Sequence, residues 1–150
     1  EKPKDLTILN LQESAQTALS LIRSRASEFA ISNDVFQQYD IHIHIPAGSI
    51  SKDGPSAGIT IFAALLSLLT GRPARRNVAL TGEMTLSGRV LPVSGIREKM
   101  LAAQRAGILL VVVPEANRDE VLALPADVSA GLQVNMVKNI DEMIDMILLP

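Results

Sequence analysis

The sequence predicts an α/β fold in which helices pack on a mixed sheet, and three observations support this expectation. The chain has 150 residues, the length of one domain with a core of its own. Apolar residues make up 47% and charged residues 20%, a composition typical of globular proteins and not of disordered chains. Segments with the apolar spacing of strands alternate with segments of helical spacing. We therefore expect a single domain over residues 1–150.

The first half of the chain is expected to contain two long helices and two strand segments. Residues 6–10 are a short strand candidate, and residues 11–31 carry apolar side chains at the three-to-four spacing of a helix. Residues 39–45 alternate isoleucines with polar residues, which predicts a half-buried strand. A polar, glycine-containing loop over residues 46–54 leads into residues 55–70. That last stretch is apolar nearly all round and predicts a central, buried helix.

The second half alternates short strands with helices. Residues 78–81 and the β-branched run 109–113 predict buried strands, the latter central in its sheet. Residues 86–89 predict a turn between two further short strands. We expect a helix over residues 96–106 that ends at Gly107. The remaining elements are a helix over 118–124, a strand over 133–137 and a terminal helix over 140–147.

Charge and composition narrow the class of partner. The formal net charge is −2 at pH 7, so no large positive field is available to hold a nucleic acid. The absence of cysteine excludes disulfides, thiolate catalysis and cysteine-ligated zinc, and it fits a reducing cytoplasm. The longest apolar run, residues 59–69, is too short to span a bilayer, and the first residues show no signal-peptide pattern. We expect a cytoplasmic protein without a membrane partner.

The loop that precedes the buried helix is the first candidate site. Gly54 allows close backbone approach, and Pro55 fixes one dihedral at the first helical turn. Ser56 then lies where backbone N–H groups have no intrahelical partner and the helix dipole favours negative charge. There its hydroxyl could attack a carbonyl while nearby N–H groups receive the oxyanion. Judged on this loop alone, a helix cap is the alternative reading of Ser56.

A phosphate site is a second functional reading of the same loop. Glycine-rich turns that open a helix cradle phosphates through the same N–H groups and the same dipole. However, the sequence contains neither a Gly-x-x-x-x-Gly-Lys-Ser/Thr run nor a Gly-x-Gly-x-x-Gly run. A nucleotide-binding function therefore remains an alternative without a supporting motif.

Lys99 breaks the amphipathic pattern of the helix over residues 96–106. On a helical wheel it falls inside the apolar arc, between Ala103 and Ala106. It could extend along its methylene stem to water or pair with a carboxylate. Alternatively, desolvation could keep the amine neutral so that it acts as a base. Lowering its pKa from about 10.4 to about 7.5 requires roughly 4 kcal/mol of bias toward the neutral form. Together with Ser56 it would form a Ser-Lys dyad.

Four further residues are candidates for supporting roles. His42 and His44 project from one face of the segment that runs into the Ser56 loop. We expect them to line a polar surface; a place in a substrate groove is the alternative, and a metal would need a third ligand that nothing nearby provides. Asp53 could cap the following helix or act electrostatically on Lys99. Thr81 is either an ordinary strand residue or a hydroxyl that accepts a hydrogen bond from Lys99.

Three ordered motifs resemble the Lon protease family. Residues 52–58 (Lys-Asp-Gly-Pro-Ser-Ala-Gly) are similar to its nucleophile motif, residues 81–93 to its second block, and residues 95–107 to its lysine helix. The likeness runs from about residue 13 to the end of the chain. It implies that Ser56 is the acylating nucleophile, Lys99 the general base and Thr81 the hydroxyl that orients the lysine.

The resemblance also implies properties of the whole protein. Members of the family have a compact α/β proteolytic domain, form hexameric rings around an inner chamber, and degrade unfolded, damaged or degron-bearing proteins. Two positions depart from the family pattern: Ser51 stands in place of a customary proline, and Ser94 in place of a customary glycine. No ATPase motif occurs in the 150 residues. We expect a proteolytic domain without cofactor or metal, cut from a longer chain whose upstream β-rich segment and ATPase region precede it. The alternative is a Lon-like protein with altered energy coupling.

These features lead to one expected function and two alternatives. The expected function is a serine endopeptidase, the protease domain of an ATP-dependent Lon, from the cytoplasm or, alternatively, the mitochondrial matrix. The first alternative is a non-catalytic Lon-like domain that only builds rings. The second is a phosphate- or nucleotide-binding domain that uses the glycine-containing loop.

Overall fold

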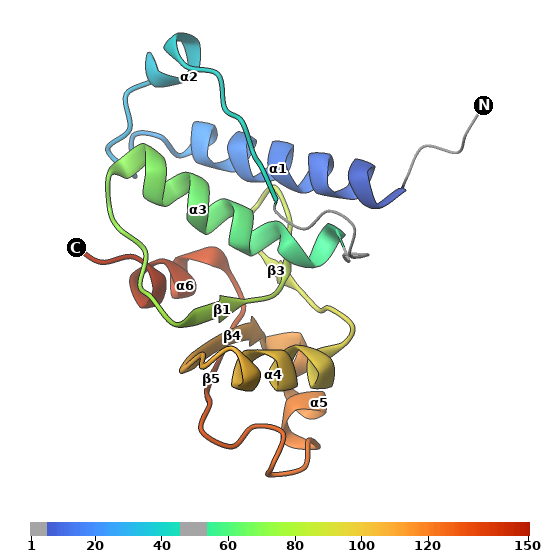
Figure 1. Cartoon of the computed structure of the whole chain (residues 1–150). Helices are drawn as coiled ribbons and strands as arrows, with labels where there is room; N and C mark the ends of the chain where they lie inside the picture. Colours follow the sequence, from blue (N-terminus) through green and yellow to red (C-terminus); the bar gives the residue numbers. More distant parts are fainter. Residues whose placement is uncertain (1–5, 46–53) are drawn as a thin grey trace.

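The computed structural model describes residues 6–45 and 54–150, and its elements form three layers (Figure 1). A parallel sheet lies in the middle, with three helices on one face and two on the other. The helices and helical turns are α1 (Leu6–Ser24), α2 (Val35–Gln38), η1 (Gly54–Ala57), α3 (Gly58–Thr70), α4 (Ile96–Arg105), η2 (Glu115–Asn117), α5 (Arg118–Leu122) and α6 (Ile140–Ile147). The strands are β1 (Val78–Leu80), β2 (Glu83–Met84), β3 (Val90–Leu91), β4 (Leu110–Pro114) and β5 (Gln133–Val137).

The strands confirm the α/β class and refine the sheet. Strands β1, β4 and β5 form a parallel sheet in the order β1-β4-β5, whereas β2 and β3 form a separate antiparallel pair. The expected single mixed sheet is therefore two small sheets. Strand β4 is central and buried, as its β-branched run predicts. Strand β1 is an edge strand and only half-buried, so the prediction of a buried strand there was wrong in degree.

Two hydrophobic clusters fill the spaces on either side of the parallel sheet. Val112 points into the larger cluster, with α1, α3 and α6, while its neighbours Val111 and Val113 point into the smaller cluster beneath α4. This alternation is the two-residue period of a strand, and it lets one strand anchor both layers. Helices α1 and α3 pack against each other in the larger layer (Figure 1).

The N-terminal helix corrects one predicted strand. Residues 6–10 belong to α1, so the short strand expected there was wrong. A five-residue segment with three apolar side chains cannot be assigned by periodicity alone, and a helix that is already nucleated gains one hydrogen bond for each residue it adds. The same helix ends at Ser24, before the expected end at residue 31. The chain leaves it through turns in which Ala30 has φ 56° and Ile31 N–H donates to Ala26 O at 2.8 Å.

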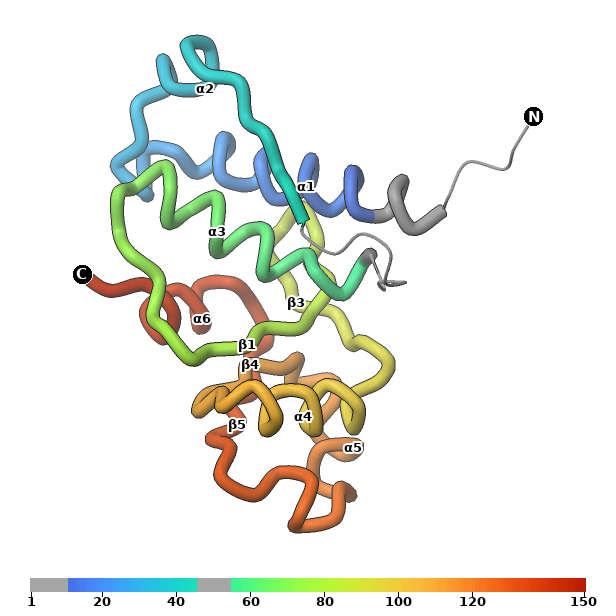
Figure 2. Tube along the Cα trace, in the orientation of Figure 1, coloured from blue at the N-terminus to red at the C-terminus, as the bar shows by residue number. Residues whose placement is uncertain are grey.

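The segment over residues 39–45 is a second correction. It follows α2 and passes α1 and α3 without joining either sheet, so it is not a strand (Figure 2). The predicted alternation is present in part, since Ile41 and Ile45 are half-buried and both histidines are exposed, but Ile43 is exposed as well. An alternating sequence predicts extended backbone, but a strand also needs a neighbour for its N–H and C=O groups.

Helix α3 is the predicted central helix, with one difference. Its buried face includes Ile59, Phe62 and Leu66, and Gly71, in the left-handed region with φ 70°, ends it. The opposite stripe of Thr60, Ala64 and Leu68 is exposed, so the helix is not buried all round. That stripe faces a hollow beside residues 41–45. In the described part of the chain, no helix is long and apolar enough to cross a membrane.

Candidate active site

A groove of about 490 Å³ brings together Ser56, Thr81 and Lys99. The three residues come from η1, from the end of β1 and from α4, so only the fold places them side by side. The other walls are apolar and small: Ala57, Ala79, Leu80, Ala102, Ala103, Ala106, Ile108 and Val111, with Thr60 at one side. An apolar groove with a few converging polar groups is the usual form of a small binding or reaction site.

Ser56 is half-buried in the 3-10 turn that leads into α3. The N-cap position of α3 is occupied by Ala57, so Ser56 does not hold the capping position of that α-helix. The turn is fixed to the chain that follows β1. Gly82 N–H donates to Ser56 O at 2.9 Å, and Ile59 N–H donates to Gly82 O at 3.1 Å. These two bonds hold the serine close to the end of the parallel sheet.

The close approach at that point requires glycine. A Cβ atom on Gly82 would lie 2.9 Å from Val90 Cγ1 and 3.0 Å from Ile59 Cδ1. A Cβ atom on Gly58 would lie 3.2 Å from the backbone nitrogen of Met84. The start of α3 and the β2–β3 pair are therefore packed backbone against backbone, which leaves the serine turn little room to shift.

Lys99 lies on the apolar side of α4, as the helical wheel predicts, and its side chain is half-buried against the alanines of the groove. Its Nζ donates a hydrogen bond to Ser94 O at 2.9 Å. The acceptor belongs to the loop between β3 and α4, where Gly95 takes the left-handed conformation with φ 74°. The lysine amine is thus held at the groove by a backbone carbonyl that the sequence does not reveal.

Thr81 is buried at the end of β1, with 6% of its surface exposed. Its N–H donates to Val112 O at 3.1 Å, but its Oγ1 makes no hydrogen bond within the described structure. The predicted hydrogen bond from Lys99 to this hydroxyl is therefore not formed here. A buried hydroxyl left without a partner costs about 1–3 kcal/mol, so its retention calls for an explanation outside folding.

Ser56 also borders a second hollow, of about 200 Å³. Its lining includes Pro55, Glu83 and the loop residues Val93 and Ser94. The loop that supplies the acceptor for Lys99 thus also passes the nucleophile candidate. Gly54 opens η1 as expected of a turn residue, whereas Asp53 and Ser51 lie outside the described residues.

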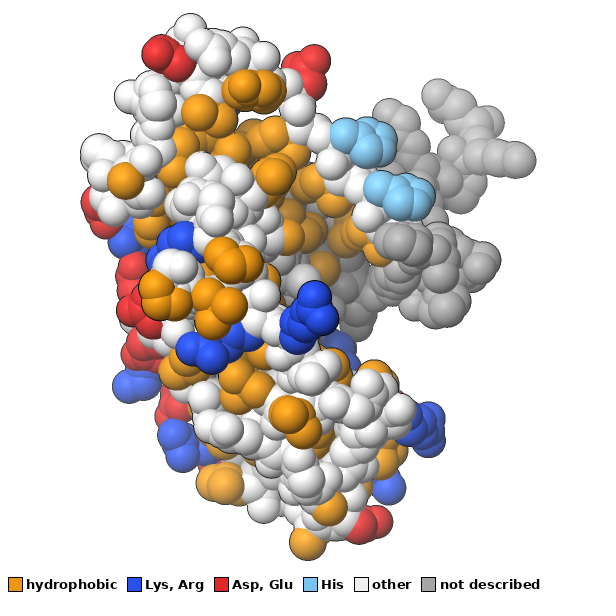
Figure 3. Space-filling model, turned by 60° about the vertical axis from the view of Figure 1, so that its left-hand side comes forward, with side chains coloured by type: hydrophobic (Ala, Val, Ile, Leu, Met, Phe, Trp, Pro, Cys, Tyr) orange, Lys and Arg blue, Asp and Glu red, His pale blue; other side chains and the backbone are white. Residues whose placement is uncertain are grey.

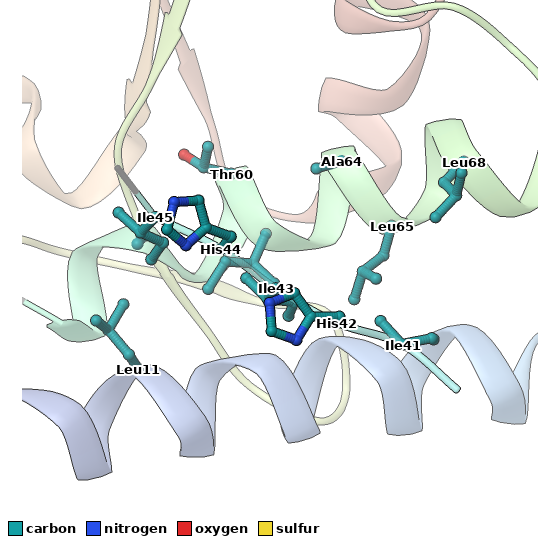
Figure 4. Close-up of a pocket in the computed structure, with 12 residues that line it drawn as sticks. Leu11, Ile41, His42, Ile43, His44, Ile45, Thr60, Ala64, Leu65 and Leu68 are labelled. Atoms are coloured by element: carbon teal, nitrogen blue, oxygen red, sulfur yellow. The ribbon is translucent and has the colours of Figure 1, made fainter. Parts of the chain in front are cut away.

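His42 and His44 lie on the other side of the start of α3. They line a separate apolar hollow of about 470 Å³, together with Leu65 and Leu68 (Figure 4). Both imidazoles are exposed on the surface (Figure 3). This hollow shares Ala57 and Thr60 with the Ser56 groove, so the two adjoin at the helix start. Within residues 6–45 and 54–150, no three His, Cys, Asp or Glu side chains are grouped to hold a metal ion.

One residue beside this site, Asn117, has no feature in the sequence that predicts a role there. Asn117 is buried after β4 and binds the backbone of Val93, in the loop that carries the acceptor for Lys99. An asparagine just before a predicted helix is ordinarily read as its cap. Only the chain path brings it to a loop 24 residues away.

A serine hydroxyl and a lysine amine that line one apolar groove are the arrangement expected of a hydrolase that uses a Ser-Lys dyad. Comparison with known proteins agrees with this class. The sequence model of the family described as "Lon protease (S16) C-terminal proteolytic domain" matches residues 8–150. The chain belongs to this family.

Individual relatives support the same assignment. The chain is 50% identical over 139 residues to the Lon protease of Desulforamulus reducens, covering 93% of this chain and 17% of that protein. It is 54% identical over 134 residues to the Lon protease of Heliobacterium modesticaldum (89% and 16%), and 52% identical over 134 residues to Lon protease 1 of Myxococcus xanthus (89% and 16%). The chain therefore spans about one sixth of the length of these relatives.

Proposed function

We propose that the chain is a serine endopeptidase domain in which Ser56 is the nucleophile and Lys99 the general base. The observation that carries the proposal is one apolar groove lined by both side chains and by the hydroxyl of Thr81, which has no hydrogen-bond partner among the described residues. The family membership supports the reaction class, because the family is described as a proteolytic domain.

In the proposed acylation step, Ser56 Oγ attacks the carbonyl carbon of the scissile peptide bond. Its proton passes to the neutral amine of Lys99, and the carbonyl oxygen becomes an oxyanion near backbone N–H groups of the helix start. The tetrahedral intermediate then breaks its C–N bond, and the lysine ammonium gives the proton to the departing amine. A water molecule repeats the sequence on the acyl-enzyme, which releases the acid and restores the serine.

Thr81 is proposed to orient the lysine during this cycle. A neutral amine has two N–H donors and one lone pair, so it can donate to Ser94 O and to Thr81 Oγ1 while it accepts from Ser56. Thr81 Oγ1 supports this role, since it is buried in the same groove and accepts no hydrogen bond from any residue that the structure describes. The hydroxyl would receive its hydrogen bond when the lysine turns toward the serine.

The remaining predicted site residues are proposed to shape the entrance. Gly54 and Pro55 would fix the turn before Ser56, and Asp53 would cap that turn or act on the charge of Lys99. His42 and His44 would flank the path of an extended substrate, because the hollow they line adjoins the Ser56 groove. No metal ion or organic cofactor has a part in the proposed reaction.

We propose for the whole protein the properties that the resemblance implies. It would be an ATP-dependent Lon protease of the cytoplasm or the mitochondrial matrix, with ATP and magnesium bound by an ATPase region and not by this domain. Its protomers would form a hexameric ring, and its substrates would be unfolded, damaged or degron-bearing proteins. The relatives are about six times as long as this chain and are named Lon protease, which supports a longer Lon protease as the whole protein. The ring, the ATP dependence, the compartment and the substrates rest on the family resemblance alone.

Cleavage of casein by single variants tests the proposed function. Ser56→Ala and Lys99→Met should each lower the rate of casein cleavage by about a thousandfold or more, because a dyad member has no substitute. Ser87→Ala, in the exposed hairpin turn, and Lys138→Met, on the exposed surface, are matched controls that should keep the parent rate. Cleavage by Ser56→Ala at the parent rate would refute the assignment.

Two further measurements separate the alternatives. A β-lactone should acylate Ser56 and raise the mass of the chain by that of the whole lactone, since the ring opens without a leaving group. A non-catalytic assembly domain would remain unlabelled. A nucleotide-binding domain would release heat on titration with ATP and magnesium, whereas the proposed peptidase domain should release none.

A further inference from the structure

The side chain of Asn117 pairs with the backbone of Val93 in the manner of a neighbouring strand. Its Oδ1 accepts from Val93 N–H at 3.0 Å, and its Nδ2 donates to Val93 O at 2.9 Å. The side chain is 6% exposed, so water competes little for these groups. One amide thus satisfies both polar groups of a loop residue that belongs to no strand.

Asn117 binds Val93 and does not cap the helix that follows it. It occupies the N-cap position of α5, where an asparagine side chain ordinarily accepts a hydrogen bond from the first helical turn. No such capping bond is formed, and Nδ2 instead donates a second time, to Glu120 Oε2 at 3.1 Å. The side chain of Asn117 therefore joins the loop between β3 and α4 to Glu120 of α5, and it does not cap a backbone N–H of that helix.

That loop binds one proposed member of the dyad and lines a hollow together with the other. Ser94, the next residue after Val93, supplies the carbonyl that accepts from Lys99 Nζ at 2.9 Å. Val93 and Ser94 also line the smaller hollow that Ser56 borders. The end of β4 is a firm base for Asn117, since Val113 and Pro114 are buried in the central strand.

We propose that Asn117 is a positioning residue for the Ser-Lys dyad: by pairing with Val93 it fixes the loop whose Ser94 carbonyl holds the amine of Lys99 at the groove that Ser56 also lines. This inference rests on the proposed function. A lysine side chain has four rotatable bonds, and its helix fixes only one end. The carbonyl fixes the other end, and Asn117 fixes the peptide units that precede the carbonyl. Misplacement of a reacting group by about 1 Å can cost about a hundredfold in rate.

The variant Asn117→Asp provides a test in which the same protein is compared at two pH values. A protonated carboxyl group has one O–H donor and one acceptor, like the amide, and can keep both bonds to Val93. An ionised carboxylate has only acceptors, and it would face the carbonyl of Val93 and the carboxylate of Glu120. Burial and the negative charge of Glu120 both disfavour ionisation, so they raise the pKa of the introduced carboxyl group well above the value of about 4 for a free aspartate. A rise of about one unit or more leaves about half or more of these groups protonated at pH 5. The pairing is thus restored as the pH falls.

The measurement is the rate of Ser56 acylation by a β-lactone, followed by mass, for parent and variants between about pH 5 and pH 8. Each variant rate is divided by the parent rate at the same pH, which removes the titration of the dyad itself. Asn117→Asp should be slower than the parent by about tenfold or more at pH 8 and should recover toward it at pH 5. Asn117→Ala, which lacks both bonds at any pH, should be slow throughout.

The matched control is Asn135→Asp, the same change in a partly buried asparagine of β5 whose Nδ2 lies 3.6 Å from Met146 Sδ. It should label at the parent rate. A deficit below tenfold for Asn117→Asp at pH 8, no recovery at pH 5, or an equal deficit for Asn135→Asp would overturn the proposal. If Asn117→Ala does not fold, the pH comparison within Asn117→Asp decides alone. A parent chain that is never labelled at Ser56 would overturn the proposed function and this inference together.

Discussion

Two hollows adjoin at the start of α3, and they are built in different ways. The Ser56 groove has walls from α3, the parallel sheet and α4, and its turn is tied down by hydrogen bonds to Gly82. The histidine hollow has α1 and α3 on one side and, on the other, residues 41–45, which join neither sheet. The first places three polar groups among small apolar residues, whereas the second offers an apolar surface edged by two exposed imidazoles.

The difference agrees with the proposed function, in which the Ser56 groove would carry out the chemistry and the histidine hollow would bind part of the substrate. A reacting constellation must be held within a fraction of an ångström, which requires a rigid support such as the parallel sheet. A surface that accepts varied unfolded chains needs apolar area and tolerance of shape. The histidine hollow, bounded by a segment without a strand partner, has these features. Substitutions in each hollow test the contrast between the Ser56 groove and the histidine hollow.

Replacing Lys99 by arginine should affect only the Ser56 groove. A guanidinium remains charged at every accessible pH, so Lys99→Arg keeps a cation and hydrogen-bond donors but removes the base. We expect casein cleavage to fall by about 10³-fold or more, because general-base catalysis contributes about 10²–10⁴-fold. The rate constant of Ser56 acylation, measured by mass, should fall equally. Retention of a tenth of the parent rate would show that Lys99 acts as a donor and not as a base.

The buried face of α3 supports both hollows and can be tested through stability. Phe62 is fully buried and packs edge-on against Phe29, with ring centroids 6.4 Å apart. Phe62→Ala should lower the free energy of unfolding by about 3–5 kcal/mol through lost burial and a residual cavity. Leu68 lies on the exposed stripe of the same helix and is 71% exposed. Leu68→Ala should therefore change the free energy of unfolding by less than about 0.5 kcal/mol.

Urea unfolding followed by circular dichroism measures the free energy of unfolding of each variant. The slope of that free energy against urea concentration should equal the parent's, which shows that parent and variant expose the same surface on unfolding. Equal losses for Phe62→Ala and Leu68→Ala would mean that the exposed stripe is covered in solution. The contrast between the two faces of α3 would then be lost.

Most of the scaffold follows from local sequence patterns. The limits of β5 and α6 agree with the predicted ranges, and the left-handed Gly71 and Gly107 end their helices as expected. These elements are specified by apolar periodicity and by glycine, both of which act within a few residues. Residues 6–10 were misassigned because a short apolar run suits a helix or a strand, and only the helix that continues from it decides.

The site was predictable only in part, for a related reason. Ser56 and Lys99 stand out because each departs from its local pattern, and the groove then brings them together. The carbonyl of Ser94 and the amide of Asn117 carry no such mark. A backbone acceptor exists at every residue, and an asparagine before a helix resembles a cap. Their importance arises from the path of the chain between β3 and α5, which periodicity does not encode.

Thr81→Val tests whether the Thr81 hydroxyl, at the end of β1, contributes to catalysis and not to the stability of the fold. Valine has nearly the shape of threonine without the hydroxyl, and Thr81 Oγ1 has no hydrogen-bond partner in the described structure. Stability should therefore stay the same or rise by up to about 1 kcal/mol. The rate of Ser56 acylation should fall by about tenfold, because Lys99 loses a group that orients it. A loss of stability without a loss of rate would assign this hydroxyl to the fold.

The smallest effect is expected from the double substitution His42→Ala and His44→Ala. Both imidazoles are exposed at the edge of the apolar hollow, and neither lines the Ser56 groove, so they should act on the binding of long substrates alone (Figure 4). The KM for casein should change by about two- to threefold, since one exposed contact is worth well under 1.4 kcal/mol. Acylation of Ser56 by a small β-lactone should be unchanged, because that reagent reaches only the Ser56 groove. A fall in the acylation rate would instead mean that the histidines take part in the reaction at Ser56. The two hollows would then form one functional site.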